Sequence, residues 1–340
     1  MAEERICGKG MDTAEGRTYE VSERKMAQVY ADTMIRLMNE NPDVAELEAD
    51  LGACIMGGKM DEIDSYPGQL INCGIQEANM VGVACGMAAA GKIPFAHSFA
   101  PFISRRANDQ IFISGCYSGA NVKLIGSDPG IMAAYNGGTH MPFEDIAALR
   151  AFPGLTIIEP TDEVMLESLL RLLVKEKGMY YIRCARKAVV RIYEDEQDFT
   201  IGKGIIVREG SDVSIIASGI MTVEALIAAD RLEEEGISAR VVDMFTIKPL
   251  DEELVLRCAE ETGAIVTAEN HSIYNGLGSA VCEAVCENAP VPVERVGVHD
   301  SFGEVGDMEY LKKKFHLTAE DIAIKAKAAV ARKRGKYEKD

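Results

Sequence analysis

The stretch "GIQEANMVGVACGMAAAGKIPFAHSFAPF", residues 74–102, decides the fold because it couples a helix to a buried strand. A run of small apolar residues follows Glu77 and predicts a closely packed helix from Glu77 to Ala90. The next run, "KIPFAHSF", predicts a strand over residues 92–99. Strands that alternate with helices indicate a mostly parallel sheet with helices on both faces.

The same alternation extends in both directions along the chain. Further strands are predicted at 44–50, 68–75, 121–127, 155–160 and 179–185. Further helices are predicted at 22–40, with Ser22 as its cap, and at 108–117 and 162–175.

A second alternating set follows the charged stretch "YEDEQDFTIGKG" (193–204). Its strands are predicted at 212–219, 237–244, 264–270 and 291–298, and its helices at 222–235, at 251–261 and after Gly278. The sequence therefore predicts an α/β fold of two consecutive domains, each with a mostly parallel sheet flanked by helices. We place the domains at residues 20–195 and 205–332, with a linker at 196–204.

Composition narrows the class of protein. The 340 residues include 54 acidic and 36 basic ones, and the formal charge of −18 argues against a nucleic acid partner. Nine cysteines without a C-x-x-C pair indicate reduced thiols and no metal site on this chain. No signal-peptide pattern or apolar run long enough for a membrane span is evident, so we expect a cytoplasmic protein.

Several short motifs are candidates for chemistry. Glu77 enters an apolar helix, where a carboxylate is costly unless it is paired or has a task, although a helix N-terminus alone can stabilise an acid. The segment "YNGGTHMP" (135–142) presents His140 after a flexible glycine pair, and an ordinary loop histidine explains it equally well. Phe99 and Phe102 have a spacing more often found in a core than in a ligand-stacking pair. The segment "NGLGSA" (275–280) predicts a turn into a helix, because it lacks the third glycine of a dinucleotide fingerprint.

Taken in register, these motifs resemble the transketolase family. "GIQEANMVGVACGMAAAGKIPFAHSFAPF" and "YNGGTHMPFEDIAALRAFPGLTIIEPTD" resemble its thiamine-diphosphate-binding pyrimidine domain, and "ENHSIYNGLGSAVCE" resembles the transketolase C-terminal domain. The resemblance covers roughly residues 20–330. It implies a transferase that uses thiamine diphosphate to move a two-carbon ketol unit between sugars, as in the pentose phosphate pathway.

The resemblance also implies roles for individual residues. Glu77 would be catalytic, with its carboxyl group bonded to the aminopyrimidine ring and controlling its protonation, and His140 would serve the reacting groups of the substrate. The implied cofactor-binding residues are Asp50 and Leu51 on the thiazolium side and Glu77, Phe99 and Phe102 on the pyrimidine side. The implied substrate-binding residues are Arg24, Cys54, His97, Ser127, Asn136, His140 and Arg186.

Four positions depart from the family pattern. Asn136 stands where the family usually has Asp, Cys54 where it has Ser, and Ser127 where a His is expected, while Arg105 replaces an aromatic residue. Two arginines still favour a substrate with an anionic tail. The changes predict a tail different from that of ordinary pentose phosphates, such as the sulfonate of a sulfosugar.

A partner chain is the last implication of the resemblance. The chain contains no Gly-Asp-Gly triplet, with which the family's diphosphate domain holds magnesium and the diphosphate. We therefore expect the C-terminal half of a split transketolase, whose partner subunit holds most of the Mg²⁺ site, in an α2β2 heterotetramer. The alternatives are the beta subunit of a 2-oxo acid dehydrogenase and a non-catalytic subunit that retains the fold. The "NGGTHMP" segment and the paired arginines favour a sugar substrate. Deoxyxylulose phosphate synthase is less favoured, because that enzyme is normally one continuous chain.

Overall fold

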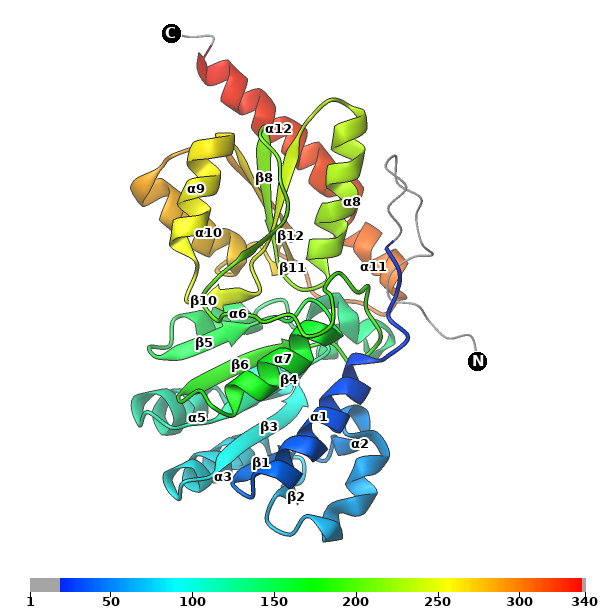
Figure 1. Ribbon diagram of the computed structural model, residues 1–340, viewed down its shortest axis with the longest axis vertical. Helices are drawn as coiled ribbons and strands as arrows, with labels where there is room; N and C mark the ends of the chain where they lie inside the picture. Colours follow the sequence, from blue (N-terminus) through cyan, green and yellow to red (C-terminus); the bar gives the residue numbers. More distant parts are fainter. Residues whose placement is uncertain (1–18, 338–340) are drawn as a thin grey trace.

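The computed structural model describes residues 19–337, which build two β-sheets that lie one above the other in Figure 1. The first sheet has seven strands in the order β10-β5-β6-β4-β3-β1-β2, and the second has five in the order β12-β11-β8-β9-β7. Every pair of neighbouring strands is parallel except β10 with β5 and β7 with β9. The predicted α/β architecture with two mostly parallel sheets is confirmed.

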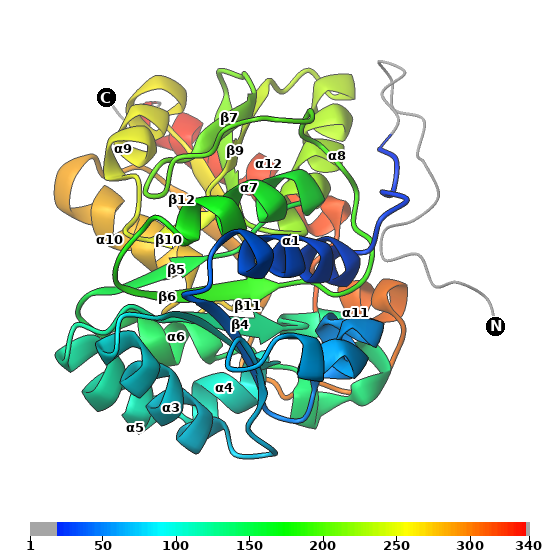
Figure 2. The same cartoon turned by 60° about the horizontal axis from the view of Figure 1, so that its bottom comes forward.

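The first sheet lies between two layers of helices (Figure 2). Its strands are β1 (Val44–Glu48), β2 (Leu70–Asn72), β3 (Ile93–Phe99), β4 (Lys123–Ser127), β5 (Leu155–Ile158), β6 (Met179–Cys184) and β10 (Thr246–Lys248). Helices α1 (Met26–Glu40) and α7 (Glu163–Leu173) cover one face, and α3 (Glu77–Ala89), α4 (Ala100–Arg106) and α6 (Asp145–Arg150) cover the other. Shorter helical segments are α2 (Gly52–Ile55), η1 (Gly57–Ser65), α5 (Asn108–Gln110), η2 (Ile111–Tyr117), η3 (Gly130–Asn136) and η4 (Gly138–His140).

The second sheet is arranged in the same way. Its strands are β7 (Ile205–Arg208), β8 (Val213–Ala217), β9 (Ala239–Asp243), β11 (Ile265–Ser272) and β12 (Val293–Val298). Helices α8 (Met221–Glu234) and α12 (Ala319–Tyr337) lie on one face, and α9 (Glu252–Thr262) and α10 (Leu277–Asn288) on the other (Figure 1). Helix α11 (Met308–Lys314) precedes α12. Within residues 19–337, no helix combines the length and the apolar character that crossing a bilayer requires.

The start of α1 differs from the prediction that Ser22 caps it. The helix begins at Met26, and the Ser22 hydroxyl instead donates a hydrogen bond to Glu163 on α7 at 2.6 Å. The backbone N–H of Ala27 donates to the carbonyl oxygen of Arg186 at 3.0 Å, and that of Met26 to Lys187 at 3.4 Å. Because backbone carbonyls satisfy these first N–H groups, the helix needs no side-chain cap.

The two halves of the chain share a sheet and a buried polar cluster. Strand β10 comes from the second half but pairs antiparallel with β5, at the edge of the first sheet. Nearby, the fully buried Arg183 donates to Asp145 at 2.8 Å, to Glu159 at 2.6 Å and to the carbonyl oxygen of Asn270 at 3.0 Å. A buried guanidinium with several charged partners holds elements together only while all partners stay in place. These contacts fix the second half against the sheet that carries the site.

Candidate active site

Glu77 is the first residue of α3, and its side chain is only 2% exposed. The Ser98 hydroxyl, from β3, donates to Oε1 of Glu77 at 3.0 Å. The Nη1 atom of Arg106, from α4, donates to both carboxylate oxygens, at 3.0 and 3.1 Å. The helix N-terminus adds a favourable dipole. These contacts compensate the free-energy cost of burying the Glu77 carboxylate.

Three aromatic rings lie beside this acid. Phe99 ends β3 and Phe102 lies in the first turn of α4, with ring centroids 5.8 Å apart. The His140 ring lies 5.5 Å from Phe99 and 4.9 Å from Phe102. The guanidinium of Arg106 lies 4.1 Å above the Phe102 ring, and that of Arg186 lies 4.8 Å from the centre of Phe99. The structure thus brings five predicted site residues, Glu77, Phe99, Phe102, His140 and Arg186, into one cluster.

The loop that carries His140 needs its two glycines. Gly137 has a φ of 76°, a conformation that favours glycine. A Cβ atom on Gly138 would collide with the carbonyl oxygen of Gly303, in the loop before α11. The second half of the chain therefore packs directly on the backbone of the His140 loop. Asn136, at the end of η3, is exposed beside it.

The imidazole of His140 is kept neutral by its surroundings. Burial lowers its pKa, and the charges of Arg106, Arg186 and Arg105 lower it further. One ring nitrogen, Nδ1, lies 2.9 Å from the hydroxyl of Thr139. A neutral imidazole can donate one hydrogen bond and accept another, which suits a carbonyl or hydroxyl group of a sugar.

Arg186 follows β6 and is held by an acid. Its Nε donates to Oδ2 of Asp128 at 2.7 Å, and its Nη2 contacts the same oxygen. Oδ1 of Asp128 is buried and has no hydrogen-bond partner among the described residues. Burial lowers the pKa of Arg186, but Asp128 and, more weakly, the half-buried Cys54 on α2 raise it overall. Cys54 is therefore within electrostatic reach of the Arg186 guanidinium.

Arg24 lies apart from this cluster. Its half-exposed side chain forms an ion pair of 3.8 Å with Glu167 on α7. Glu167 also accepts from Arg36 at 3.1 Å and pairs with Arg171. The structure does not bring the Arg24 and Arg186 guanidinium groups together on one anion.

His97 and Ser127 lie behind the site, and both are fully buried. The Nδ1 atom of His97 is 2.7 Å from Oε2 of Glu48, and its Nε2 is 2.9 Å from the Ser127 hydroxyl. Burial, followed by the charge of Arg186, lowers the pKa of His97 to about 3, so the ring is neutral. In this structure both side chains belong to a closed network rather than to an open surface.

That network continues to a pair of acids on β1. The hydroxyl of Tyr30 donates to Oε2 of Glu46 at 2.7 Å, and each of Glu46 and Glu48 keeps a buried Oε1 that no hydrogen-bond donor reaches among the described residues. Burial raises the pKa of both acids well above the ordinary value, and repulsion from Glu48 raises that of Glu46 further. We infer that the two neighbouring carboxyl groups share a proton.

The remaining cofactor candidates follow β1. Asp50 has a φ of 61°, and its carboxylate accepts from the side-chain amide of Asn72 at 2.9 Å. Leu51 is half-buried at the start of α2. Asp50, Phe99, Ser127 and Arg186 thus follow or end the parallel strands β1, β3, β4 and β6, at the edge of the sheet where ligands bind in such folds.

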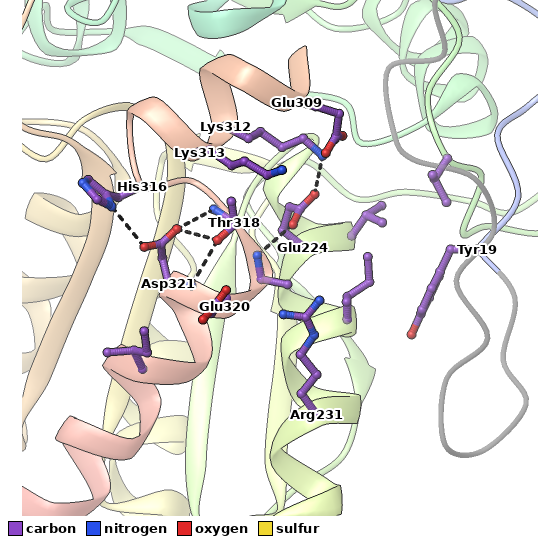
Figure 3. Close-up of a pocket in the computed structure, with 15 residues that line it drawn as sticks. Tyr19, Glu224, Arg231, Glu309, Lys312, Lys313, His316, Thr318, Glu320 and Asp321 are labelled. Atoms are coloured by element: carbon purple, nitrogen blue, oxygen red, sulfur yellow. Dashed lines mark hydrogen bonds and ion pairs between the residues drawn. The ribbon is translucent and has the colours of Figure 1, made fainter. Parts of the chain in front are cut away.

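A separate cavity of about 460 Å³ lies between α8 and the segment that joins α11 to α12 (Figure 3). Part of its charged lining is paired internally, since Lys312 contacts Glu224 at 2.8 Å and Asp321 accepts from the backbone of Thr318 at 3.2 Å. None of its lining residues belongs to the cluster around Glu77. The cavity is therefore separate from the candidate active site.

Family comparisons agree with this geometry. Residues 22–190 match "Transketolase, pyrimidine binding domain", and residues 202–322 match "Transketolase, C-terminal domain". The chain is 48% identical over 313 residues to the "6-deoxy-6-sulfo-D-fructose transketolase subunit SqwH" of Clostridium sp. (strain MSTE9), covering 92% of this chain and 97% of that protein. The chain belongs to the transketolase family.

A second relative of this transketolase-family chain is also named as a transketolase subunit. The chain is 37% identical over 294 residues to an apulose-4-phosphate transketolase subunit of Phocaeicola vulgatus, covering 86% of this chain and 93% of that protein. A solved structure described as "Split gene transketolase, inactive beta4 tetramer" matches with a TM-score of 0.83 and 39% identity, covering 92% of this chain and 100% of that one. The resemblance to split transketolase subunits is confirmed, and a thiamine-dependent, transketolase-type function is supported.

The cluster around Glu77 fits the aminopyrimidine ring of thiamine diphosphate, the cofactor that the pyrimidine domain implies. It combines a buried carboxylate with two aromatic rings, the hydrogen-bonding and stacking groups that a flat, nitrogen-rich ring requires. The described part of the chain holds no group of three or more His, Cys, Asp or Glu side chains arranged for a metal ion. Arg106 and Ser98, the two partners of Glu77, were not among the predicted site residues. The signal in the sequence that could have identified Arg106 is its position four residues after Phe102, on the same helix α4.

Proposed function

We propose that this chain is one subunit of a split, thiamine-diphosphate-dependent transketolase that transfers a two-carbon ketol unit from a ketose to an aldose. The observation that carries the proposal is the cluster of Glu77, Phe99, Phe102 and His140 at the carboxyl ends of parallel strands. We place the two domains at residues 20–195 and 205–332.

Each residue of the cluster has a task in this proposal. Bound thiamine diphosphate supplies the nucleophilic carbon and the electron sink of the reaction. The Glu77 carboxyl group, only 2% exposed, holds a proton at the pyrimidine ring. Phe99 and Phe102 offer aromatic faces to the ring, and neutral His140 hydrogen-bonds the carbonyl and hydroxyl groups of the sugar.

The anionic tail of the substrate is assigned to Arg186. Its guanidinium is partly exposed beside Cys54, and it can exchange Asp128 for a sulfonate or phosphate oxygen. The name of the relative SqwH includes 6-deoxy-6-sulfo-D-fructose, which motivates a sulfonated ketose as the substrate of this chain. Arg24 could contact the anionic tail only after its ion pair with Glu167 breaks. His97 and Ser127 could contact the substrate only if they became exposed.

A partner subunit would complete the site. The turn before α3, two residues from Glu77, forms a face that exposes the apolar side chain of Ile75, which is 70% exposed. We propose that this face binds a subunit carrying the diphosphate and Mg²⁺ sites, in an assembly of two copies of each chain. The relatives that are named as transketolase subunits support such a partner.

The test is reconstitution of the complex. The chain, co-expressed with the product of the adjacent gene, is supplied with thiamine diphosphate and Mg²⁺. We expect ketol transfer from 6-deoxy-6-sulfofructose to a phosphorylated aldose, and much less from fructose, which has the same skeleton with a neutral tail. Acyl transfer from pyruvate to lipoamide instead would assign a 2-oxo acid dehydrogenase. A complex that binds no thiamine diphosphate would be a non-catalytic one.

A further inference from the structure

Arg106 makes the two contacts that a pyrimidine ring at this site would need. Its Nη1 atom bridges both oxygens of Glu77, at 3.0 and 3.1 Å. Its guanidinium carbon lies 4.1 Å above the centre of the Phe102 ring. One planar, nitrogen-rich group thus donates to the acid and stacks on the aromatic ring at the same time.

The pairing has a clear cause in the fold. A carboxylate that is 2% exposed is costly without a partner, and Ser98 reaches only Oε1. Phe102 and Arg106 are four residues apart on α4 and so share one helix face, which directs the guanidinium across the ring toward Glu77. The Arg106 side chain is nevertheless 50% exposed, so its charged end can move to water without unfolding α4.

We propose that Arg106 is a placeholder for the pyrimidine ring of the cofactor. It pairs with Glu77 and covers Phe102 while the ring is absent, and the ring displaces it into solvent on binding. This inference rests on the proposed function, because it assumes that the ring binds at Glu77. The exchange is non-covalent: the hydrogen bonds and the stacking contact of Arg106 are lost, and those of the ring replace them.

Two consequences follow from such an exchange. Without the cofactor, Arg106 stabilises the chain by compensating a buried charge. During cofactor binding it competes with the ring, so its removal favours the bound state. Truncating Arg106 should therefore lower the stability of the isolated chain but raise the affinity for the cofactor. Truncating a side chain that contacts the bound cofactor would lower the affinity instead.

The first experiment uses the full chain alone. Urea unfolding is compared for the wild type, Arg106→Ala, Glu77→Gln and the double variant. Arg106→Ala should lower the midpoint, and its effect should largely disappear in the Glu77→Gln background. Arg105→Ala is the matched control: Arg105 contacts the carbonyl oxygens of Pro101 and Thr139 and pairs with Glu144, so its effect should be the same in both backgrounds. Equal coupling of both arginines to Glu77 would overturn the assigned pairing.

The second experiment measures the dissociation constant of thiamine diphosphate, with Mg²⁺, for the complex assembled with the adjacent gene's product. Arg106→Ala should bind roughly threefold to tenfold more tightly than the wild type. Arg106→Lys should lie between them, because it keeps the charge without the planar group. Unchanged or weaker binding by Arg106→Ala would overturn the inference and leave the proposed function intact. No binding by the wild-type complex would overturn both.

Discussion

Two buried acidic sites, one at the start of α3 and one on β1, compensate their burial in different ways. Glu77 is paired with a guanidinium whose far side reaches solvent. The Glu46–Glu48 pair has only the neutral groups Tyr30 and His97 as direct partners among the described residues, and burial raises the pKa of both carboxyl groups. Both arrangements remove the cost of an isolated buried charge. In the proposed function, a ligand replaces the partner of Glu77 alone, and this difference would separate a reactive acid from a structural one.

The largest expected effect is on catalysis by Glu77. In the assembled complex, Glu77→Gln should lower the kcat of ketol transfer roughly 10²- to 10⁴-fold, because Gln keeps the shape of the side chain but cannot exchange a proton. Glu48→Gln, measured in the same assay, should lose far less. If the Glu48 variant loses as much activity as the Glu77 variant, the distinction between the two sites is wrong.

The free energy of unfolding should depend more on Glu48 than on Glu77, which reverses the order expected for activity. Glu48→Ala removes the partner of His97 Nδ1 and of the shared proton on Glu46, leaving buried polar atoms unsatisfied. We expect it to lower the free energy of unfolding by about 3 kcal/mol, measured by urea titration. Glu48→Gln should cost less than half of this, because the amide can still bond to His97. Equal losses in the two variants would mean that a cavity, and not the network, causes the effect.

The contrast between these acids shows where prediction from the sequence reaches its limit. Hydrophobic periodicity is local, so the alternation of strands and helices could be predicted, and so could the glycine pair before His140. In "VAELEAD", Glu46 and Glu48 alternate with apolar residues, a pattern typical of a solvent-facing strand side. Tyr30 on α1 covers that side, and nothing in the strand itself records it.

Pairings between distant segments were also beyond the sequence. Arg106 meets Glu77 across 29 positions, and only the crossing of α3 and α4 brings them together. Strand β10 is three residues long and joins a sheet built almost entirely from the other half of the chain. The motif resemblance located Phe99, Phe102 and His140 because those residues carry a family pattern. It could not show that His97 and Ser127 would be fully buried, with His97 bonded to both Glu48 and Ser127.

The dependence of stability on pH should separate the shared proton from other effects. A carboxyl group whose pKa is raised by folding stabilises the folded state below its unfolded pKa, and this stability is lost as the pH rises through the folded value. The free energy of unfolding should therefore fall as the pH rises above about 4.5, by up to about 1.4 kcal/mol per unit for each proton.

The matched control for this slope is the Glu46→Gln/Glu48→Gln double variant, in urea titrations between pH 5 and 8. Burial also raises the pKa of Asp243 and of Glu269 to about 7, so both proteins should keep the slope from these two acids. The difference between the two curves reports the Glu46–Glu48 pair. Parallel curves would contradict the raised pKa values of that pair.

The smallest expected effects come from the hydroxyl groups that serve each site. Tyr30→Phe removes the donor to Oε2 of Glu46, and Ser98→Ala removes one of two donors to Oε1 of Glu77. Tyr30→Phe should lower the free energy of unfolding by roughly 1–2 kcal/mol, because a buried oxygen is left without a partner. Ser98→Ala should cost under about 1 kcal/mol, because Arg106 still donates to the same oxygen.

In the Arg106→Ala background the Ser98 hydroxyl becomes the remaining side-chain donor to Glu77 among the described residues, so its removal should then cost as much as Tyr30→Phe. The urea unfolding midpoints of these four variants test whether Arg106 compensates Glu77 for the loss of the Ser98 hydroxyl. If Ser98→Ala lowers the free energy of unfolding equally with and without Arg106, then Arg106 does not compensate for the lost hydroxyl.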